Sequence, residues 1–192
     1  MYFKGYSRKV VMDENMEMHS EYVYEGTYYT MDCPDNVWIR RKGRVLILFL
    51  LAAVTLIWGM MGAAEANARK GIVFLQAASL LLLLGTAICV CCRLSAGRKM
   101  TDWEYRMSVV SIREFALMDM LALGAAAAAV GCGVLFGLFA FSMAEVTLFL
   151  KLVAGAAFSW ILMREVKKEV YREEISQDLP HGVDMTNDFE NI

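Results

Sequence analysis

The sequence is short of several features that soluble enzymes and nucleic-acid-binding proteins use. Proline is scarce, with two residues in 192, and the net charge of −2 provides no basic field for a nucleic-acid partner. Only two histidines are present, His19 and His181, and neither belongs to a recognisable catalytic arrangement. Phosphate-binding Gly-rich loops, nucleophile elbows, zinc-protease motifs and dinucleotide fingerprints are missing. These absences lower the expectation of an enzyme, and we predict neither a cofactor nor a metal site.

Charged residues are missing from long stretches of the chain, while other stretches carry nearly all of the charge. Apolar residues make up 58% of the chain, which exceeds the roughly 45–50% of a soluble domain. This segregation is typical of a protein that lies in a lipid bilayer. The first 44 residues are polar and lack the short apolar core of a signal peptide. We therefore expect the first apolar run to be a true membrane span.

Four apolar runs are long enough to cross a membrane: residues 45–64, 71–92, 117–141 and 146–163. A helix rises ~1.5 Å per residue and the hydrocarbon layer is ~30 Å thick, so about 20 residues make one crossing. The runs show no strand alternation, and only a helix satisfies its own backbone hydrogen bonds in lipid. The sequence therefore predicts an all-α integral membrane protein, a four-transmembrane-helix bundle of two antiparallel hairpins.

Lysine and arginine are distributed unevenly around these runs. Sixteen lie before the first run, between the second and third, or after the fourth, whereas the other two loops hold only Arg69 and Lys70. Loops rich in Lys and Arg stay in the cytoplasm. We therefore expect both termini and the loop 93–116 inside, and two short loops outside. A simple charge asymmetry of this kind suits a bacterial inner membrane.

The N-terminal segment 1–44 is predicted to form a β-hairpin followed by a basic anchor next to the membrane. Residues 9–12 and 21–24 are the two expected strands, and they flank a plausible turn at 13–15. A lone hairpin is marginal in water, so we expect it to pack on the cytoplasmic helices, on the membrane surface or on a partner.

The other two cytoplasmic segments are predicted to be helical next to the membrane. In the loop 93–116, Thr101 and Glu104 match a capping box that starts an amphipathic helix, which runs into the third span. Segment 164–192 is expected to extend the fourth span as a helix to residue 177 and to end in an acidic tail.

Small residues recur at every fourth position on the third and fourth runs. They are Ala125, Ala129, Gly133 and Gly137 on the third and Gly155 and Ser159 on the fourth. Small residues at this spacing let helix backbones approach closely in lipid. They predict either a homodimer face or packing within the monomer's own bundle, and we favour packing within the monomer because such patterns are common in spans.

Three polar residues within the runs are candidates for an intramembrane site, because ionisable groups are costly in a bilayer: Gln76, Lys151 and Asp119. Gln76 and Lys151 lie at similar depth and could form one polar spot, or Lys151 could instead extend to the outer surface towards Glu145. Asp119 lies near the cytoplasmic end of its run, where it could pair with Arg164 or couple to a proton or cation. We favour the extended lysine and the ion pair, since no second acid continues a relay.

Five cysteines are present, and Cys89, Cys91 and Cys92 crowd the cytoplasmic end of the second run. The cytoplasm is reducing, so a disulfide framework is not expected. Cys89 and Cys92 could bind a soft metal, and lipidation is a second alternative. We favour plain packing, because no histidine or further cysteine lies nearby at ligand spacing.

A chain of four spans and fewer than 200 residues resembles the small multidrug exporters in size. Those exporters carry an essential carboxylate in the first span, and residues 45–64 contain no acidic residue. The resemblance therefore fails at its essential residue, and no family is assigned. The small residues of the third run, the cytoplasmic β element and helices, and the scarcity of polar residues in the runs favour a non-enzymatic accessory or scaffolding subunit that contacts lipid and other membrane proteins, or a second copy of itself. A small oligomeric transporter or channel subunit is the alternative, and an enzyme using Cys89, Cys92 or His19 ranks last.

Overall fold

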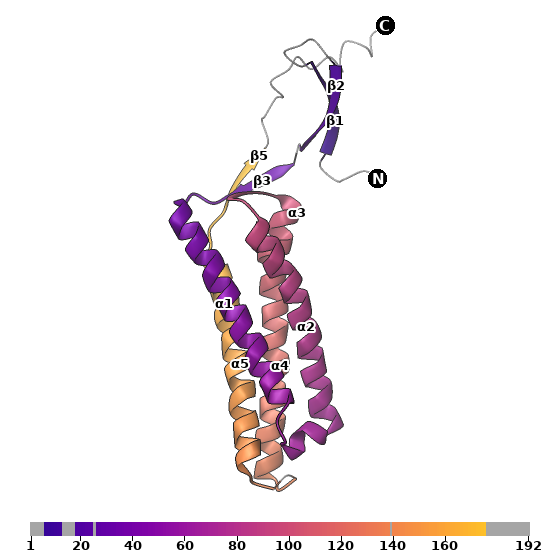
Figure 1. Cartoon of the computed structure of the whole chain (residues 1–192), viewed down its shortest axis with the longest axis vertical. Helices are drawn as coiled ribbons and strands as arrows, with labels where there is room; N and C mark the ends of the chain where they lie inside the picture. The colour runs from indigo at the N-terminus through magenta and orange to yellow at the C-terminus, as the bar shows by residue number, and fades with distance from the viewer. Residues whose placement is uncertain (1–5, 13–17, 25, 139, 176–192) are drawn as a thin grey trace.

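The computed structural model describes residues 6–12, 18–24, 26–138 and 140–175, most of which are helical (Figure 1). The bundle consists of α1 (Asp35–Met60), α2 (Lys70–Ser95), α4 (Ser111–Leu135) and α5 (Met143–Lys167). All four helices are long and apolar enough to cross a membrane. The structure is thus compatible with a multi-pass membrane protein. The end of the bundle that carries strands β3 (Thr27–Thr30), β4 (Lys99–Thr101) and β5 (Arg172–Ile175) is named the sheet end, and the opposite end is named the loop end.

The third span is part of a longer helix. The short helix α3 (Asp102–Tyr105) and the π-helix η2 (Arg106–Val110) lead directly into α4, so that 34 residues form one continuous helical segment. Glu104 N–H donates to Thr101 Oγ1, and the Glu104 carboxylate accepts from the Thr101 backbone N–H, which confirms the predicted capping box.

Helix α4 ends at Leu135, six residues before the end predicted for the third span. Gly137 adopts a φ of 67°, and its N–H donates to the carbonyl of Val134. The next N–H, of Leu138, donates to the carbonyl of Gly133. These two bonds form a Schellman motif, which a glycine in the left-handed conformation allows. The apolar residues after Leu135 therefore belong to a loop and not to the span.

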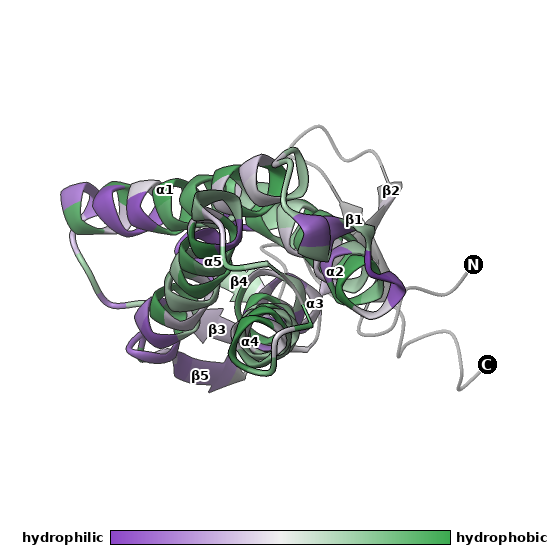
Figure 2. Cartoon of the chain, turned by 90° about the horizontal axis from the view of Figure 1, so that it is seen from below, coloured by the Kyte–Doolittle hydropathy of each residue, from purple (hydrophilic) through white to green (hydrophobic). Residues whose placement is uncertain are grey.

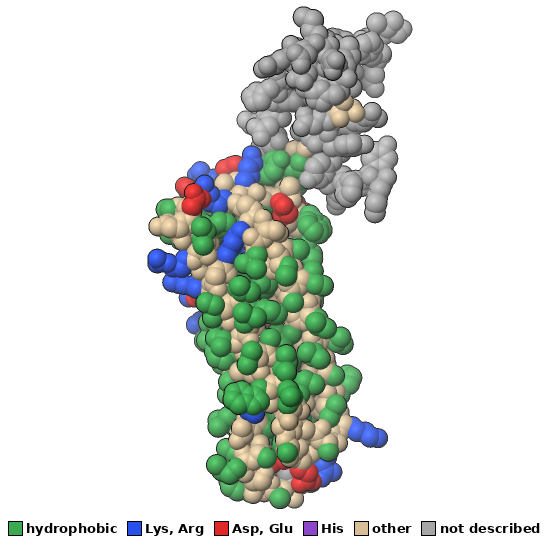
Figure 3. Space-filling model, viewed as in Figure 1, with side chains coloured by type: hydrophobic (Ala, Val, Ile, Leu, Met, Phe, Trp, Pro, Cys, Tyr) green, Lys and Arg blue, Asp and Glu red, His purple; other side chains and the backbone are tan. Residues whose placement is uncertain are grey.

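Within the bundle, α4 lies between α2 and α5, and α1 packs more extensively against α5 than against α2 (Figures 1 and 2). Leu123 and Leu152 lie in the core of the loop-end half, and Ile112 and Leu162 lie in the core of the sheet-end half. On the face that Figure 3 shows, the middle of the helical bundle is largely apolar. An apolar surface of this extent is unfavourable in water, which is consistent with contact to lipid.

The predicted N-terminal hairpin is present. Strand β1 (Tyr6–Met12) pairs antiparallel with β2 (Met18–Tyr24), in a register that places Lys9 opposite Glu21. The predicted turn at 13–15 lies outside the described residues, as does the acidic tail that begins at Asp178.

A three-stranded antiparallel sheet closes the sheet end. Its central strand is β3 (Thr27–Thr30), flanked by β4 (Lys99–Thr101) and β5 (Arg172–Ile175). In this register Tyr28 lies opposite Thr101 on one side and Glu174 on the other. The sheet thus joins three segments that are distant in the sequence.

Strand β5 overturns the prediction that α5 extends as a helix to residue 177. The helix ends at Lys167, and the chain then turns so that Glu169 and Tyr171 reach into the bundle towards Arg93. The following residues pair with the edge of β3, whose Thr-Tyr-Tyr-Thr sequence favours a strand. These nonlocal contacts outweigh the local helix propensity of the charged segment.

Candidate functional site

The described part of the bundle buries eight polar or charged side chains, which lie at several levels along its length. They are Gln76, Ser79, Thr86, Arg93, Ser108, Asp119, Glu145 and Ser159. Burying such groups is costly unless they are hydrogen-bonded, and a buried charge is most costly. The partners of the three charged side chains therefore decide what the interior can do.

Asp119 lies in the interior, where α2, α4 and α5 meet, and its side chain is fully buried. The hydroxyl of Ser79 in α2 donates to Asp119 Oδ1. The hydroxyl of Ser159 in α5 donates to Asp119 Oδ2 at 2.6 Å. We name these three residues the Asp119 triad. Each carboxylate oxygen thus accepts one hydrogen bond from a serine hydroxyl, so the Asp119 side chain connects α4 to both α2 and α5.

The depth of the Asp119 triad follows from the geometry of the α4–α5 hairpin. Asp119 lies 16 residues before the last residue of α4, and Ser159 lies 16 residues after the first residue of α5. Antiparallel helices that share one loop place such positions at the same depth, ~24 Å from the loop end. The predicted span bounds conceal this equality, because it appears only when α4 ends at Leu135 and α5 begins at Met143.

The predicted ion pair between Asp119 and Arg164 is not formed. The guanidinium of Arg164 instead lies over the ring of Trp160, with its Cζ 4.5 Å from the ring centroid. Arg164 is exposed, whereas Asp119 faces the interior. An exposed guanidinium over an aromatic ring keeps its hydration, which a pair inside the bundle would remove.

At the loop end, Gln76 binds the loop that follows α1. Its side-chain amide donates to Asn67 Oδ1 at 3.0 Å. The amide of Asn67 in turn donates to the carbonyls of Gly59 and Gly62, at 3.1 and 2.9 Å. Asn67 therefore provides hydrogen-bond donors to two carbonyls at the end of α1, and Gln76 holds the Asn67 side chain in place.

Lys151 does not join Gln76 in a polar spot, and it does not reach Glu145. Its ammonium donates to the carbonyl of Trp58 at 3.3 Å and lies 4.6 Å from the centroid of the Trp58 ring. Lys151 thus ties α5 to α1 near the loop end.

Glu145 is buried at the start of α5 and was not among the predicted site residues. Its Oε1 accepts from the backbone N–H of Ala66 at 3.1 Å. Its Oε2 is buried and has no hydrogen-bond partner. A carboxylate bound to a backbone N–H fastens the loop between α1 and α2 to the start of α5.

At the sheet end, a second buried charged group connects α2 to the chain after α5. Arg93 is fully buried, and it donates to Glu169 Oε2 and, at 3.0 Å, to the hydroxyl of Tyr171. That hydroxyl donates to Glu169 at 2.8 Å, and the Arg93 guanidinium lies over the ring of Trp38. Burial, and then the carboxylate of Glu169, raises the pKa of Tyr171. We name Trp38, Arg93, Glu169 and Tyr171 the Arg93 cluster.

The predicted small-residue positions divide between two sides of the bundle. Gly133, Gly155 and Ser159 are buried. Ala125 and Ala129 are exposed on the outer face of α4. Gly137 is exposed too and belongs to the turn after α4. Gly133, Gly155 and Ser159 thus lie inside the monomer's own bundle, whereas the prediction of packing there is wrong for Ala125, Ala129 and Gly137.

Three of the pockets formed by the described residues lie at the ends of the bundle. One of about 430 Å³ adjoins the stacked rings of Tyr29 and Tyr105 at the sheet end. A pocket of about 250 Å³ lies at the loop end beside Lys151. A cleft of about 180 Å³ lies between α1 and α5 at the sheet end. None of the three is lined by the Asp119 triad, so this group is enclosed by packed side chains.

The chemistry of the site has to be inferred from the side chains of this chain. All five cysteines are free, and Cys89 is buried while Cys91 is exposed. No group of three His, Cys, Asp or Glu side chains suited to a metal occurs in the part of the chain that is described. Comparison with protein-family models, curated proteins and solved structures finds no match. The Asp119 triad can hold a proton or fix the register of three helices.

Proposed function

We propose that this chain is a non-enzymatic membrane subunit that works by contact with other membrane proteins. The observation that carries the proposal is the division of small residues between the two sides of α4. Inside, Gly133 packs within the bundle, whereas Ala125 and Ala129 point outwards and have no partner helix within the described chain. Contact with lipid does not require a row of small residues on the outer side of a helix, whereas a partner helix needs small residues in order to approach closely.

The composition of this outer face supports the proposal further. Gly124, Ala128 and Cys132 are also exposed on α4, beside the two alanines. A Cβ added at Gly124 would have no atom within 4 Å. The face is thus shallow over several turns, while other exposed positions in the spans, such as Phe74 and Leu81, are large. We name Gly124, Ala125, Ala128, Ala129 and Cys132 the α4 face.

The test is recovery of partners after extraction in a mild detergent. A photo-crosslinking amino acid at Ala129 is expected to capture a membrane protein or a second copy of the chain. The same group at Leu81, an exposed position on α2, is the matched control and is expected to capture lipid or nothing specific. Recovery of the chain as a lone monomer, with equal and nonspecific crosslinks from both positions, would contradict the proposal.

A second candidate function, a small transporter or channel subunit, is favoured by the Asp119 triad. Asp119 is fully buried and takes part in no ion pair among the described residues; its bonds come from two hydroxyls. A buried acid without a cation is the usual starting point for a proton or cation site in a membrane. Flux in proteoliposomes that depends on Asp119, and is lost in Asp119→Asn, would support this function. No detectable flux, or flux that Asp119→Asn leaves unchanged, would remove its basis.

We infer that the sheet end faces the cytoplasm. The sixteen Lys and Arg residues that flank the spans on one side all belong to segments at this end or to the adjoining terminal segments. At the loop end, the connections contribute Arg69 and Lys70. The inner membrane of a bacterium is the location that this asymmetry suits best.

A further inference from the structure

The cleft between α1 and α5 at the sheet end is lined by more positive than negative charge. Arg41 and Arg44 line it from α1, and Lys168 lines it from the end of α5. The acidic residues in its wall are Glu165 and Glu169. Figure 3 shows Lys and Arg side chains gathered at this end of the molecule, above the apolar middle.

Existing contacts use only part of this positive charge. Glu169 is bonded to Arg93 in the Arg93 cluster, and its side chain is 3% exposed, so its charge is already compensated. Glu165 pairs with Lys168 at 2.7 Å and approaches Arg44 at 3.9 Å. Arg41 contacts the sulfur of Met31, which carries no charge. One carboxylate thus faces three cations, and the cleft has room for a further anion.

The surface below the cleft is apolar and faces outwards. On α1, Val45 forms part of the cleft wall, and Ile47 and Leu51 are exposed further along the helix. On α5, Ile161 is exposed one turn before Glu165. An anionic group held in the cleft would therefore lie at the boundary between polar and apolar surface, where the headgroup of a lipid lies with its chains along the spans.

We propose that this cleft binds the phosphate group of an anionic phospholipid. Arginine suits this role because its planar guanidinium can give two parallel hydrogen bonds to a phosphate. Arg41 and Arg44 lie three residues apart on α1, so both guanidinium groups reach one anion. The adjoining apolar surface selects a lipid over a free phosphate ion. The proposal does not depend on the contact function proposed above, since the cleft shares no residue with the α4 face.

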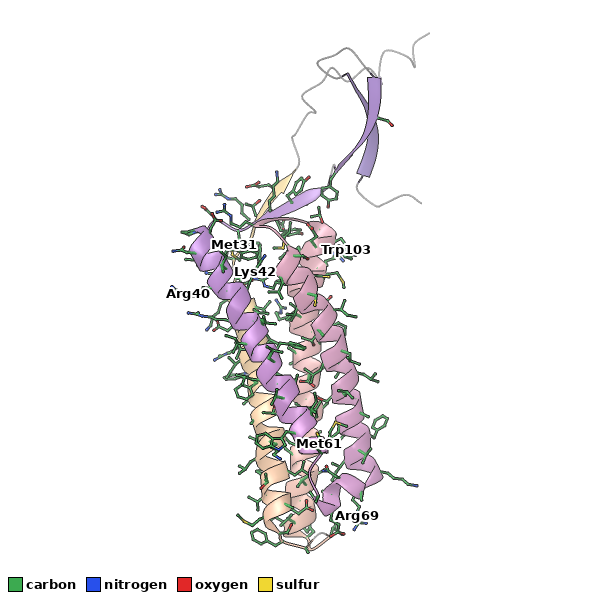
Figure 4. All side chains as sticks on the ribbon, viewed as in Figure 1. Met31, Arg40, Lys42, Met61, Arg69 and Trp103 are labelled. Carbon is green, nitrogen blue, oxygen red and sulfur yellow. The ribbon has the colours of Figure 1, made fainter. Side chains whose placement is uncertain are left out.

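The test is lipid binding to the full-length chain in a neutral detergent, followed by native mass spectrometry. Phosphatidylglycerol is expected to bind in preference to phosphatidylcholine. Arg44→Gln should weaken phosphatidylglycerol binding about fivefold, as expected for one cation near a membrane surface. Arg40→Gln is the matched control, because it removes the same charge from an exposed side chain on the outer side of α1, outside the cleft (Figure 4). Arg44→Lys keeps the charge but loses the two parallel hydrogen bonds, so it should weaken the binding less than Arg44→Gln does.

A second pair of variants tests the cleft with a change of opposite sign. Glu165→Gln removes the carboxylate in the wall and should strengthen phosphatidylglycerol binding several-fold. Glu114→Gln removes an exposed carboxylate at the same end, outside the cleft, and should leave the binding unchanged. Equal effects of the cleft and control variants would overturn the proposal, because they would indicate a diffuse field. Displacement of the lipid by millimolar inorganic phosphate would overturn the choice of a lipid.

Discussion

Asp119 accepts hydrogen bonds from Ser79 in α2 and from Ser159 in α5, and it thereby joins three helices. In lipid, hydrogen bonds between helices are worth about 0.6 kcal/mol on average and up to about 1.7. The triad therefore adds modestly to stability. Its larger effect is on register, since sliding any of the three helices would leave a buried carboxylate without its donors.

At this residue, Asp119→Leu is expected to lower stability by about 1–2 kcal/mol, because both serine hydroxyls lose their shared acceptor. Asp119→Asn keeps one acceptor oxygen and should cost less than half of that. The free energy of unfolding, from thermal or denaturant unfolding in detergent, measures both changes. An Asn variant that is as unstable as the Leu variant would show that charge, and not hydrogen bonding, holds the triad.

The Arg93 cluster depends on a buried charge pair, and breaking such a pair from one side is costly. Arg93→Met should destabilise the chain by about 3 kcal/mol, because the Glu169 carboxylate would stay buried without its cation. Arg106→Met removes a cation from an exposed pair with Asp102 and should cost less than about 0.5 kcal/mol. Unfolding in detergent compares the two. The double variant Arg93→Met with Glu169→Gln should recover much of the loss, and no recovery would contradict this reading.

Tyr171 links stability to pH, because its pKa is higher in the folded chain than the usual value of about 10. The fold favours the neutral phenol, so this contribution is complete at neutral pH and is lost as the pH rises above about 10. The melting temperature of the native chain should therefore fall more between pH 9 and pH 11 than that of Tyr171→Phe. Parallel curves for the two proteins would show that the phenol is not buried as the structure has it.

At the scale of the elements, close approach of helices depends on single glycines. A Cβ at Gly155 would lie 3.0 Å from Leu123 Cδ1 and 3.2 Å from Thr55 Oγ1, so α5 meets both α4 and α1 at this point. At Gly124 the same addition meets nothing within 4 Å. The two glycines therefore have different roles, although both lie in helices that are long and apolar enough to cross a membrane.

Gly155→Val is accordingly expected to destabilise the bundle by about 1–3 kcal/mol through overpacking. Gly124→Val introduces the same side chain on the α4 face and should change the stability of the isolated chain by less than 1 kcal/mol. The midpoints of thermal unfolding in detergent measure the difference. Similar losses in both variants would indicate that the spans pack differently from the structure described here.

The elements also differ in how they end. Helix α4 ends at Leu135, where two local hydrogen bonds around Gly137 close it, although the apolar run continues to residue 141. Helix α5 ends at Lys167 without a glycine that closes it. It ends there because Glu169 and Tyr171 accept hydrogen bonds from Arg93 and the chain then pairs with β3. A local stop can be read from residues, whereas a stop caused by distant partners cannot.

At the scale of the whole molecule, the charge asymmetry between the ends predicts a topology. A single cysteine at Ala140, in the loop between α4 and α5, should react with a membrane-impermeant maleimide in intact cells. A single cysteine at Trp103, which is 64% exposed at the sheet end, should react only after the membrane is opened. Both belong in a background without the five native cysteines. Labelling of Trp103→Cys in intact cells would reverse the orientation inferred here.

By itself, the sequence determined the number of apolar helices, the capping box at Thr101 and the N-terminal hairpin. Each depends on residues that are close in sequence. The number of helices follows from the length of each apolar run compared with the thickness of a bilayer, the capping box from hydrogen bonds within one helical turn, and the hairpin from two short segments on either side of a turn. The contributions that stabilise these three features come from residues that are close in sequence, so they can be estimated from the sequence alone.

Only the tertiary structure decided the partners of the buried groups. Asp119 could bond to any donor at its depth, and the packing of α2 and α5 selected Ser79 and Ser159 over Arg164. The sheet of β3, β4 and β5 likewise joins segments more than 140 residues apart at its extremes, as between Thr30 and Glu174. The physical reason is common to both cases: a buried polar group or a strand edge must find a partner in space, and sequence distance does not limit which one it finds.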